Sequence, residues 1–392
     1  MCLSHMNRRL TAHVKCLSTG VLSNSLKLNK VYLIALSAVG VITVLSFVWR
    51  KYYPDAMTLG INLNRKAWET SYVERGVSIP PSGPREGYWG ARLGKKIRDS
   101  RLGWHEPEIY SPGLLEIDKN GQQHYKASGP LKYKILIIGG SVAFGAYASE
   151  ISKTYFNIIG TVLDRRSAFS DITIFASGAW KSIQELKAFQ LYRKDNPPDL
   201  VVFLNGLNDL TNGATSKTLY GEKVQPADGS SWSPLYHAHD YTQRVSDYLV
   251  HMDVAWKISK NSGSDMLVVL QPSLTEREHQ TKIEETLLKG SLKPHACVQV
   301  FNESYASIRN ALVKRSENEG FHFLDCSRSF NREPATTFAD LWHFSDFGHR
   351  ILGNVMSKKI AVILKNRTGD YAKAKWLKEP KAVRHQSSTA AP

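Results

Sequence analysis

The stretch from Lys134 to Ile138 reads KILII and runs directly into GGSVAFG at residues 139–145. An unbroken apolar run of this length, rich in isoleucine, is typical of a parallel strand that is buried on both faces. The two glycines that follow let the chain turn sharply, and a serine stands at the tip of that turn. The segment therefore predicts a buried strand, a tight turn and the start of a helix, with Ser141 where the strand ends.

Four more apolar runs of similar length follow this first one. They lie at residues 171–175 (DITIF), 200–204 (LVVFL), 266–270 (MLVVL) and 321–324 (FHFL). Longer amphipathic stretches separate the runs, and another closes the region at residues 347–364. Strands that alternate with helices form right-handed crossovers and a parallel sheet between two helical layers. We therefore expect residues 132–365 to form an α/β domain, a three-layer α/β/α sandwich with a mainly parallel sheet of five strands.

A second feature is the segment 31–49, VYLIALSAVGVITVLSFVW, which carries no charged residue. As a helix it would be long enough to cross a hydrocarbon core of roughly 30 Å. Lys30 bounds it on one side, and Arg50 and Lys51 bound it on the other. Its length and charged ends favour a transmembrane helix over a buried core helix or a cleaved signal peptide. The Lys/Arg bias favours a cytoplasmic N-terminus only slightly, which would place the large domain outside the cytoplasm.

The rest of the 392-residue chain divides around these two features. Residues 1–30 form a basic leader, residues 50–131 a stalk and irregular lead-in rich in Pro and Gly, and residues 366–392 a polar basic tail. Within the lead-in we expect short strands around Leu114–Ile117 and His124–Lys126. The formal net charge is +16, and the leader contributes five Lys or Arg and no acidic residue. Because no nucleic-acid motif with interleaved aromatics accompanies this charge, we expect a membrane flank and no nucleic-acid partner.

Polar residues follow several of the predicted strands, at the edge where an open parallel sheet binds its ligand. Ser141 follows the first run, Gly178 the second and Asn208 the third, and near the C-terminus Asp340 stands three residues before His343. At that spacing a carboxylate can orient a histidine that faces a nucleophile. Each feature also has an ordinary structural explanation, as a helix cap, a loop residue or a surface pair. A phosphate-binding loop is not favoured, because no lysine follows the glycines.

The order Ser141, Gly178, Asn208 and Asp340-x-x-His343 resembles the SGNH/GDSL hydrolase superfamily over roughly residues 132–365. The resemblance implies that Ser141 is a nucleophile, His343 its base and Asp340 the partner of that base. It also implies an oxyanion hole made of the Ser141 amide, the Gly178 amide and the Asn208 side chain. No metal or organic cofactor is implied.

Two blocks depart from the commonest form of that family. The first reads Gly-Gly-Ser where Gly-Asp-Ser is usual, and the Gly-Gly-Ser form resembles that of bacterial surface-polysaccharide hydrolases. The second reads ASGA at residues 176–179, where Asn-x-Gly or Gly-x-x-Gly is usual. Ala179 therefore stays open as an alternative to Gly178 for the second oxyanion donor.

The resemblance implies a membrane-anchored serine esterase that hydrolyses carboxylic esters, acetyl esters among them, through an acyl-enzyme. The expected substrate is an acylated cell-surface glycan. One alternative is an O-acyltransferase that modifies a polysaccharide with the same triad, and another is a non-catalytic envelope scaffold. The complete set Ser141, Asn208, Asp340 and His343 argues against the scaffold. A disulfide between Cys297 and Cys326 stays open, and the four cysteines, with no CxxC spacing, do not favour a structural zinc site.

Overall fold

The computed structural model describes residues 56–81, 83–84, 97–99, 101–105, 122–211, 238–291 and 295–367. The chain divides into two compact units, residues 1–59 and 60–392, and the fold below is that of the second. The predicted anchor at residues 31–49 lies outside the described residues, as do the leader, most of the tail and much of the predicted stalk. Among the described helices, none combines the length and the apolar character that crossing a membrane requires.

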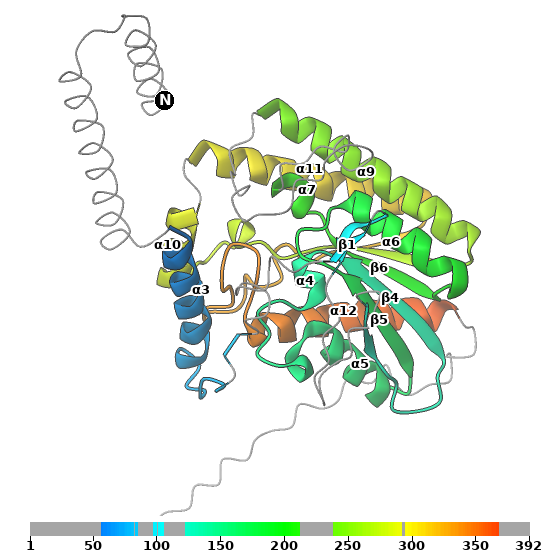
Figure 1. The fold of residues 1–392 in the computed structure, drawn as a ribbon, viewed down its shortest axis with the longest axis horizontal. Helices are drawn as coiled ribbons and strands as arrows, with labels where there is room; N and C mark the ends of the chain where they lie inside the picture. Colours follow the sequence, from blue (N-terminus) through cyan, green and yellow to red (C-terminus); the bar gives the residue numbers. More distant parts are fainter. Residues whose placement is uncertain are drawn as a thin grey trace, which may run out of the picture. The chain divides into compact units, whose positions relative to one another are not determined.

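A six-stranded sheet forms the centre of the fold, in the order β3-β5-β4-β6-β7-β8 (Figure 1). The strands from β5 to β8 in this order, five in all, run parallel to one another, and β3 pairs antiparallel with β5 at one edge. The strands are β3 (Gln122–Tyr125), β4 (Tyr133–Gly139), β5 (Ser170–Ala176), β6 (Leu200–Asn205), β7 (Asp265–Leu270) and β8 (His322–Asp325). A separate antiparallel pair comprises β1 (Ile97–Asp99) and β2 (Gly103–His105).

Helices cover both faces of this sheet. On one face α5 packs against α12, and on the other α9 lies between α6 and α11 (Figure 1). The long helices that follow β4 in the chain are α5 (Tyr155–Arg165), α6 (Ser182–Asp195), α9 (Ala238–Asn261), α10 (Lys282–Ser291), α11 (His295–Glu319) and α12 (Asp346–Arg367). Four short helices complete this part of the chain: α4 (Ser141–Phe144), α7 (Asn208–Thr211), η3 (Ile151–Lys153) and η5 (Leu274–Glu276).

The five predicted runs become the five parallel strands because both faces of each central strand are covered. In β4 the side chains from Ile135 to Ile138 are at most 1% exposed. At the end of β4, a Cβ on Gly139 would lie 2.3 Å from the carbonyl oxygen of Leu204 in β6. A glycine is therefore needed where these two strands approach each other just before the turn.

Two segments of the predicted lead-in, residues 50–131, belong to the packed domain. The short strand predicted around His124–Lys126 is present as β3, which joins the sheet as a sixth strand and pairs its Gln122 with Phe175 of β5. The short strand predicted around residues 114–117 lies outside the described residues. The helix α3 (Ala56–Val73), which the sequence does not predict, also comes from the lead-in and buries Ala67, Trp68 and Tyr72. The packed domain therefore takes up parts of the chain that lie N-terminal to residue 132.

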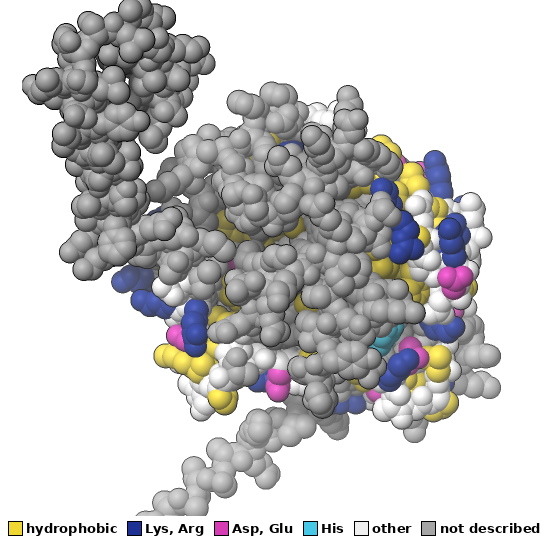
Figure 2. Space-filling view, in the orientation of Figure 1, with side chains coloured by type: hydrophobic (Ala, Val, Ile, Leu, Met, Phe, Trp, Pro, Cys, Tyr) yellow, Lys and Arg dark blue, Asp and Glu magenta, His cyan; other side chains and the backbone are white. Residues whose placement is uncertain are grey.

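Among the described side chains on the face shown in Figure 2, Lys and Arg are interspersed with acidic and apolar groups.

Cys326 is a free thiol that is completely buried, so the disulfide with Cys297 is not formed. Burial raises the pKa of the Cys326 thiol to about 12, which keeps it protonated at neutral pH.

Candidate active site

The carboxyl ends of β4 and β6 bring two of the predicted site residues, Ser141 and Asn208, together. Helix α4 begins at Ser141, two residues after β4 ends, and α7 begins at Asn208, three residues after β6 ends. The side-chain amide of Asn208 lies directly against Gly140, since a Cβ there would be 2.2 Å from Asn208 Nδ2. The nitrogen of Asn208 is therefore adjacent to the residue that precedes Ser141.

A hydrogen-bonded chain joins Ser141, His343 and Asp340. His343 Nε2 lies 2.7 Å from Ser141 Oγ, and His343 Nδ1 lies 2.7 Å from Asp340 Oδ2. Ser141 is half-buried, and His343 is only 1% exposed. With a proton on Nδ1, held by the carboxylate, Nε2 is free of hydrogen and can accept the serine proton.

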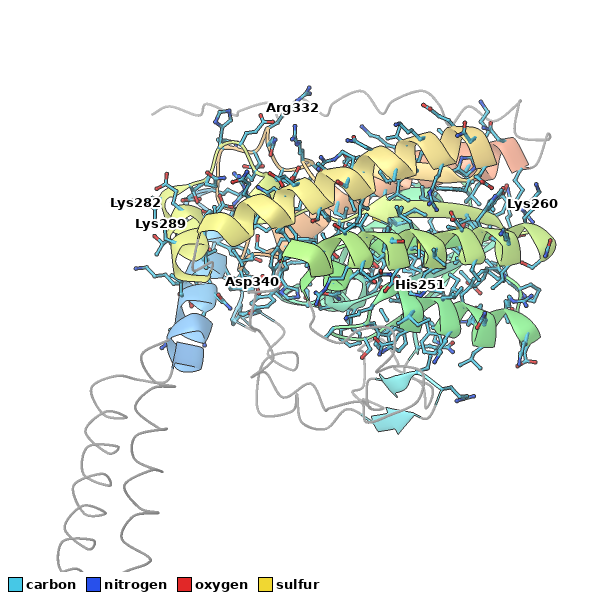
Figure 3. The ribbon with its side chains drawn as sticks, turned by 90° about the horizontal axis from the view of Figure 1, so that it is seen from above. His251, Lys260, Lys282, Lys289, Arg332 and Asp340 are labelled. Atoms are coloured by element: carbon cyan, nitrogen blue, oxygen red, sulfur yellow. The ribbon has the colours of Figure 1, made fainter. Side chains whose placement is uncertain are left out.

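The loop from Phe338 to Phe344 fixes the acid and the base relative to each other. Its ends form an antiparallel bridge, and the carbonyl of His343 accepts a hydrogen bond of 2.9 Å from Ala339 N. The second carboxylate oxygen of Asp340 accepts hydrogen bonds of 2.7 Å from both Trp342 N and His343 N. Asp340 therefore has little freedom to turn away from the imidazole. Figure 3 shows Asp340 near the end of the domain where α3 lies.

The loop after β5 holds the other predicted oxyanion residues. Ser177 N donates to Gly139 O at 3.3 Å, and Asn208 Nδ2 donates to Trp180 O at 2.9 Å, so this loop is tied to both neighbouring strand ends. Gly178 is buried, whereas Ala179 is half-buried and has a left-handed φ of 65°. The structure thus places Gly178 and Ala179 in one turn beside Asn208, and the alternative between their amides stays a prediction.

A buried polar cluster directly behind this turn was not anticipated from the sequence. Asp209 accepts hydrogen bonds from the Ser182 hydroxyl at 2.5 Å and from the Ser182 amide at 3.2 Å. The same hydroxyl lies 2.8 Å from Nδ1 of His251 on α9, which Figure 3 labels. Asp209 follows Asn208 in the chain and Ser182 begins α6, so this contact couples the loops after β5 and β6. The only sequence signal was the position of these residues next to predicted site loops.

Burial shifts the pKa values of several groups in this cluster. It lowers the pKa of Lys181 to about 8, although the Asp209 carboxylate opposes that shift. It raises the pKa of Asp209, against the effect of the Ser182 hydrogen bonds. It also raises the pKa of the completely buried Glu185 well above its usual range, and Asp209 adds to that rise. Charges here are unfavourable, as expected for ionisable groups that have left water.

A second acid–histidine pair in the same region makes different contacts. Asp346 accepts hydrogen bonds from Ser149 N at 2.7 Å and Ser149 Oγ at 2.6 Å. His349 Nε2 lies 2.9 Å from the carbonyl oxygen of Ala146. Both residues therefore hold the loop that follows α4, whereas Asp340 and His343 face Ser141. Within the described part of the chain, no cluster of three potential metal-ligating side chains is present.

Comparison with known proteins gives matches only among solved structures. No protein-family model matches the chain, and no curated protein matches it. An acetylxylan esterase from Geobacillus stearothermophilus aligns at 17% identity and a TM-score of 0.35, over 59% of this chain and 94% of that one. A protein assigned to the G-D-S-L lipolytic family from Desulfitobacterium hafniense aligns at 11% identity and a TM-score of 0.36, over 58% and 99%. Similarity at this level leaves the function to be inferred from the chemistry of the site itself.

Proposed function

We propose that the chain is a serine esterase in which Ser141, His343 and Asp340 act as a catalytic triad. The observation that carries this proposal is the pair of 2.7 Å contacts that His343 makes, one to the serine hydroxyl and one to the carboxylate. A nucleophile held by a base, with the base oriented by a third group, is the arrangement that activates a weak hydroxyl for acyl transfer.

The reaction begins when Ser141 Oγ attacks the ester carbonyl and His343 Nε2 takes the serine proton. The negative charge that develops on the carbonyl oxygen is stabilised by the Ser141 amide, by the amide of Gly178 or Ala179, and by the Asn208 side chain. His343 then gives its proton to the leaving alcohol, which departs and leaves an acyl ester on Ser141. Water attacks this ester with His343 again as the base, and the acid product and free Ser141 are released.

We also propose a substrate class and a location for the catalytic domain. We take the substrate to be a carboxylic ester with a short acyl group such as acetyl, carried by a cell-surface glycan. We also take residues 31–49 to anchor the chain in a membrane, with the catalytic domain outside the cytoplasm. Both assignments rest on the sequence: the first on the resemblance of its motifs, and the second on its uncharged segment.

The test measures hydrolysis of an aryl acetate by the full chain and by Ser141→Ala. We expect the variant to lose turnover while its thermal unfolding stays that of the wild type. A folded Ser141→Ala variant that still turns over would exclude Ser141 as the nucleophile.

Product analysis with an acetyl donor and a glycan acceptor separates the esterase from an acyltransferase with the same triad. Free acetate as the main product supports the esterase. Acetylated glycan as the main product would assign the chain to acyl transfer onto a sugar hydroxyl instead.

A further inference from the structure

One side chain that neither the proposed mechanism nor the sequence motifs use lies directly against the proposed base. The ring of Tyr147 stacks on the imidazole of His343, with ring centroids 5.4 Å apart and an angle of 23° between the planes. Tyr147 is 5% exposed, so its ring fills the space beside the base and keeps water from it. One face of the His343 ring is therefore covered by a residue from a loop that contains no member of the triad.

The backbone of Tyr147 is in a conformation that its surroundings must enforce. Its φ is 67°, in the left-handed region that residues other than glycine rarely adopt. Such a conformation persists only where neighbouring contacts hold it in place, and it is commonest at functional sites.

One face of α3 supplies contacts to Tyr147 itself. Trp68 Nε1 donates a hydrogen bond of 3.0 Å to the backbone carbonyl of Tyr147, and Asn64 Nδ2 donates one of 3.3 Å to its hydroxyl. Asn64, Trp68 and Tyr72 are spaced four residues apart, so they lie on one face of the helix. Trp68 is completely buried, and its ring packs against that of Tyr72 at 4.7 Å.

The same face of α3 reaches the start of α12, which also holds the loop. The hydroxyl of Tyr72 hydrogen-bonds to Asp346, the carboxylate that also binds Ser149 two residues beyond Tyr147. His349, one turn further along α12, binds the carbonyl of Ala146. The loop is thus held between α3 and the first turn of α12, with the Tyr147 ring directed at His343.

We propose that Tyr147 is a positioning residue for His343 and that α3 acts as the clamp that holds it there. This inference rests on the proposed esterase function. In this arrangement α3, which comes from the N-terminal lead-in, helps to hold the catalytic base in its active position. The clamp keeps the imidazole in the plane that joins Asp340 to Ser141. When it is loosened, the base is misaligned while the substrate contacts remain.

The test compares Tyr147→Leu, Tyr147→Phe, Trp68→Phe and the matched control Lys66→Ala, which changes an exposed residue of the same helix. Turnover of an aryl acetate is measured per active site, and the sites are counted by titration with a fluorophosphonate. A small displacement of a catalytic group can cost on the order of 10²-fold in rate. We therefore expect Tyr147→Leu to lower kcat per site by about 10- to 100-fold with KM nearly unchanged.

Tyr147→Phe keeps the ring and should recover most of the kcat that Tyr147→Leu loses. Trp68→Phe keeps an aromatic side chain but lacks the N–H donor, and we expect it to lower kcat per site as well. If Tyr147→Leu and Trp68→Phe lower only the melting temperature or the number of titrated sites, with kcat per site equal to that of Lys66→Ala, the inference is wrong.

Ser141→Ala in the same assay separates this inference from the proposed function. Activity that survives in Ser141→Ala would overturn the esterase itself. Loss of activity in Ser141→Ala with full kcat per site in Tyr147→Leu would overturn only the positioning role.

Discussion

Replacing Gly140 by alanine should displace the side chain of Asn208, the proposed oxyanion donor, without changing Asn208 itself. The added Cβ would lie 2.2 Å from Asn208 Nδ2, far inside any contact that real structures tolerate. The φ of Gly140 is −85°, outside the left-handed region, so the steric contact with Asn208 is the main effect of the substitution. The amide of Asn208 is the movable partner, and it must swing away and give up its hydrogen bond to Trp180 O.

The expected cost follows from the role of that amide. Loss of one oxyanion donor removes about 2.7–4 kcal/mol of transition-state stabilisation, a factor of about 10²–10³ in kcat. The lost hydrogen bond to Trp180 O should lower the free energy of unfolding by only about 1 kcal/mol. Gly140→Ala should therefore fold, bind an aryl acetate with nearly unchanged KM, and turn it over about 10²–10³ times more slowly.

A double-mutant cycle checks that the effect passes through Asn208. We expect Asn208→Ala to lower kcat by the same factor, and the double variant Gly140→Ala/Asn208→Ala to be no slower than either single variant. If Gly140→Ala keeps wild-type kcat, or if the two effects multiply, Asn208 does not donate to the oxyanion in the way described.

Three further outcomes are expected. Asp340→Asn should lower kcat on the order of 10⁴-fold, because the imidazole loses the partner that fixes its tautomer. Asp346→Asn should instead lower chiefly the stability of the fold. The reverse pattern in kinetics and thermal melts would show that the wrong acid was assigned. Lys181 is 7% exposed, and its pKa is lowered from 10.5 to about 8. Between these two pH values the unfolded chain therefore binds more protons than the folded one. The free energy of unfolding of the wild type should rise with pH over this range by about 3 kcal/mol relative to that of Lys181→Met. Denaturant titrations at pH 7 and pH 10 measure this difference, exposed Lys194→Met is the matched control on α6, and a Lys181→Met curve parallel to wild type would contradict it. A reporter fused after Pro392 should be active outside the cytoplasm, and activity confined to the cytoplasm would reverse the proposed membrane orientation.

The parallel strands could be predicted from the sequence because burial on both faces leaves an unbroken apolar run. A short strand could be predicted near the position of β3, but its place in the sheet could not, because its four residues, QQHY, are polar and carry no period. It forms at the edge of the sheet through backbone pairing with β5, and Gln123 is buried there with a hydrogen bond to the carbonyl of Phe144. Helix α3 could not be predicted, because it is held by tertiary contacts: the hydrogen-bond partners of Trp68 and Tyr72 lie 79 and 274 residues away in the sequence.

The residues of the site differ in how far the sequence could indicate them. Ser141, Asn208 and the Asp340–His343 pair stand after strands or at a diagnostic spacing, so their types and positions suggested them. Tyr147 offers no such signal, because its left-handed backbone and its stacking on His343 are set by distant contacts. Asp209 read as an ordinary loop acid, and only the fold reveals that it is buried against Ser182.

The proposed role of Ser141 is that of a nucleophile activated by His343. Treating the full chain with a fluorophosphonate, digesting it and locating the adduct by mass spectrometry tests this role directly. We expect one adduct, on Ser141, with a labelling rate that falls sharply in His343→Ala. An adduct on another residue, or labelling of Ser141 at an unchanged rate in folded His343→Ala, would contradict it.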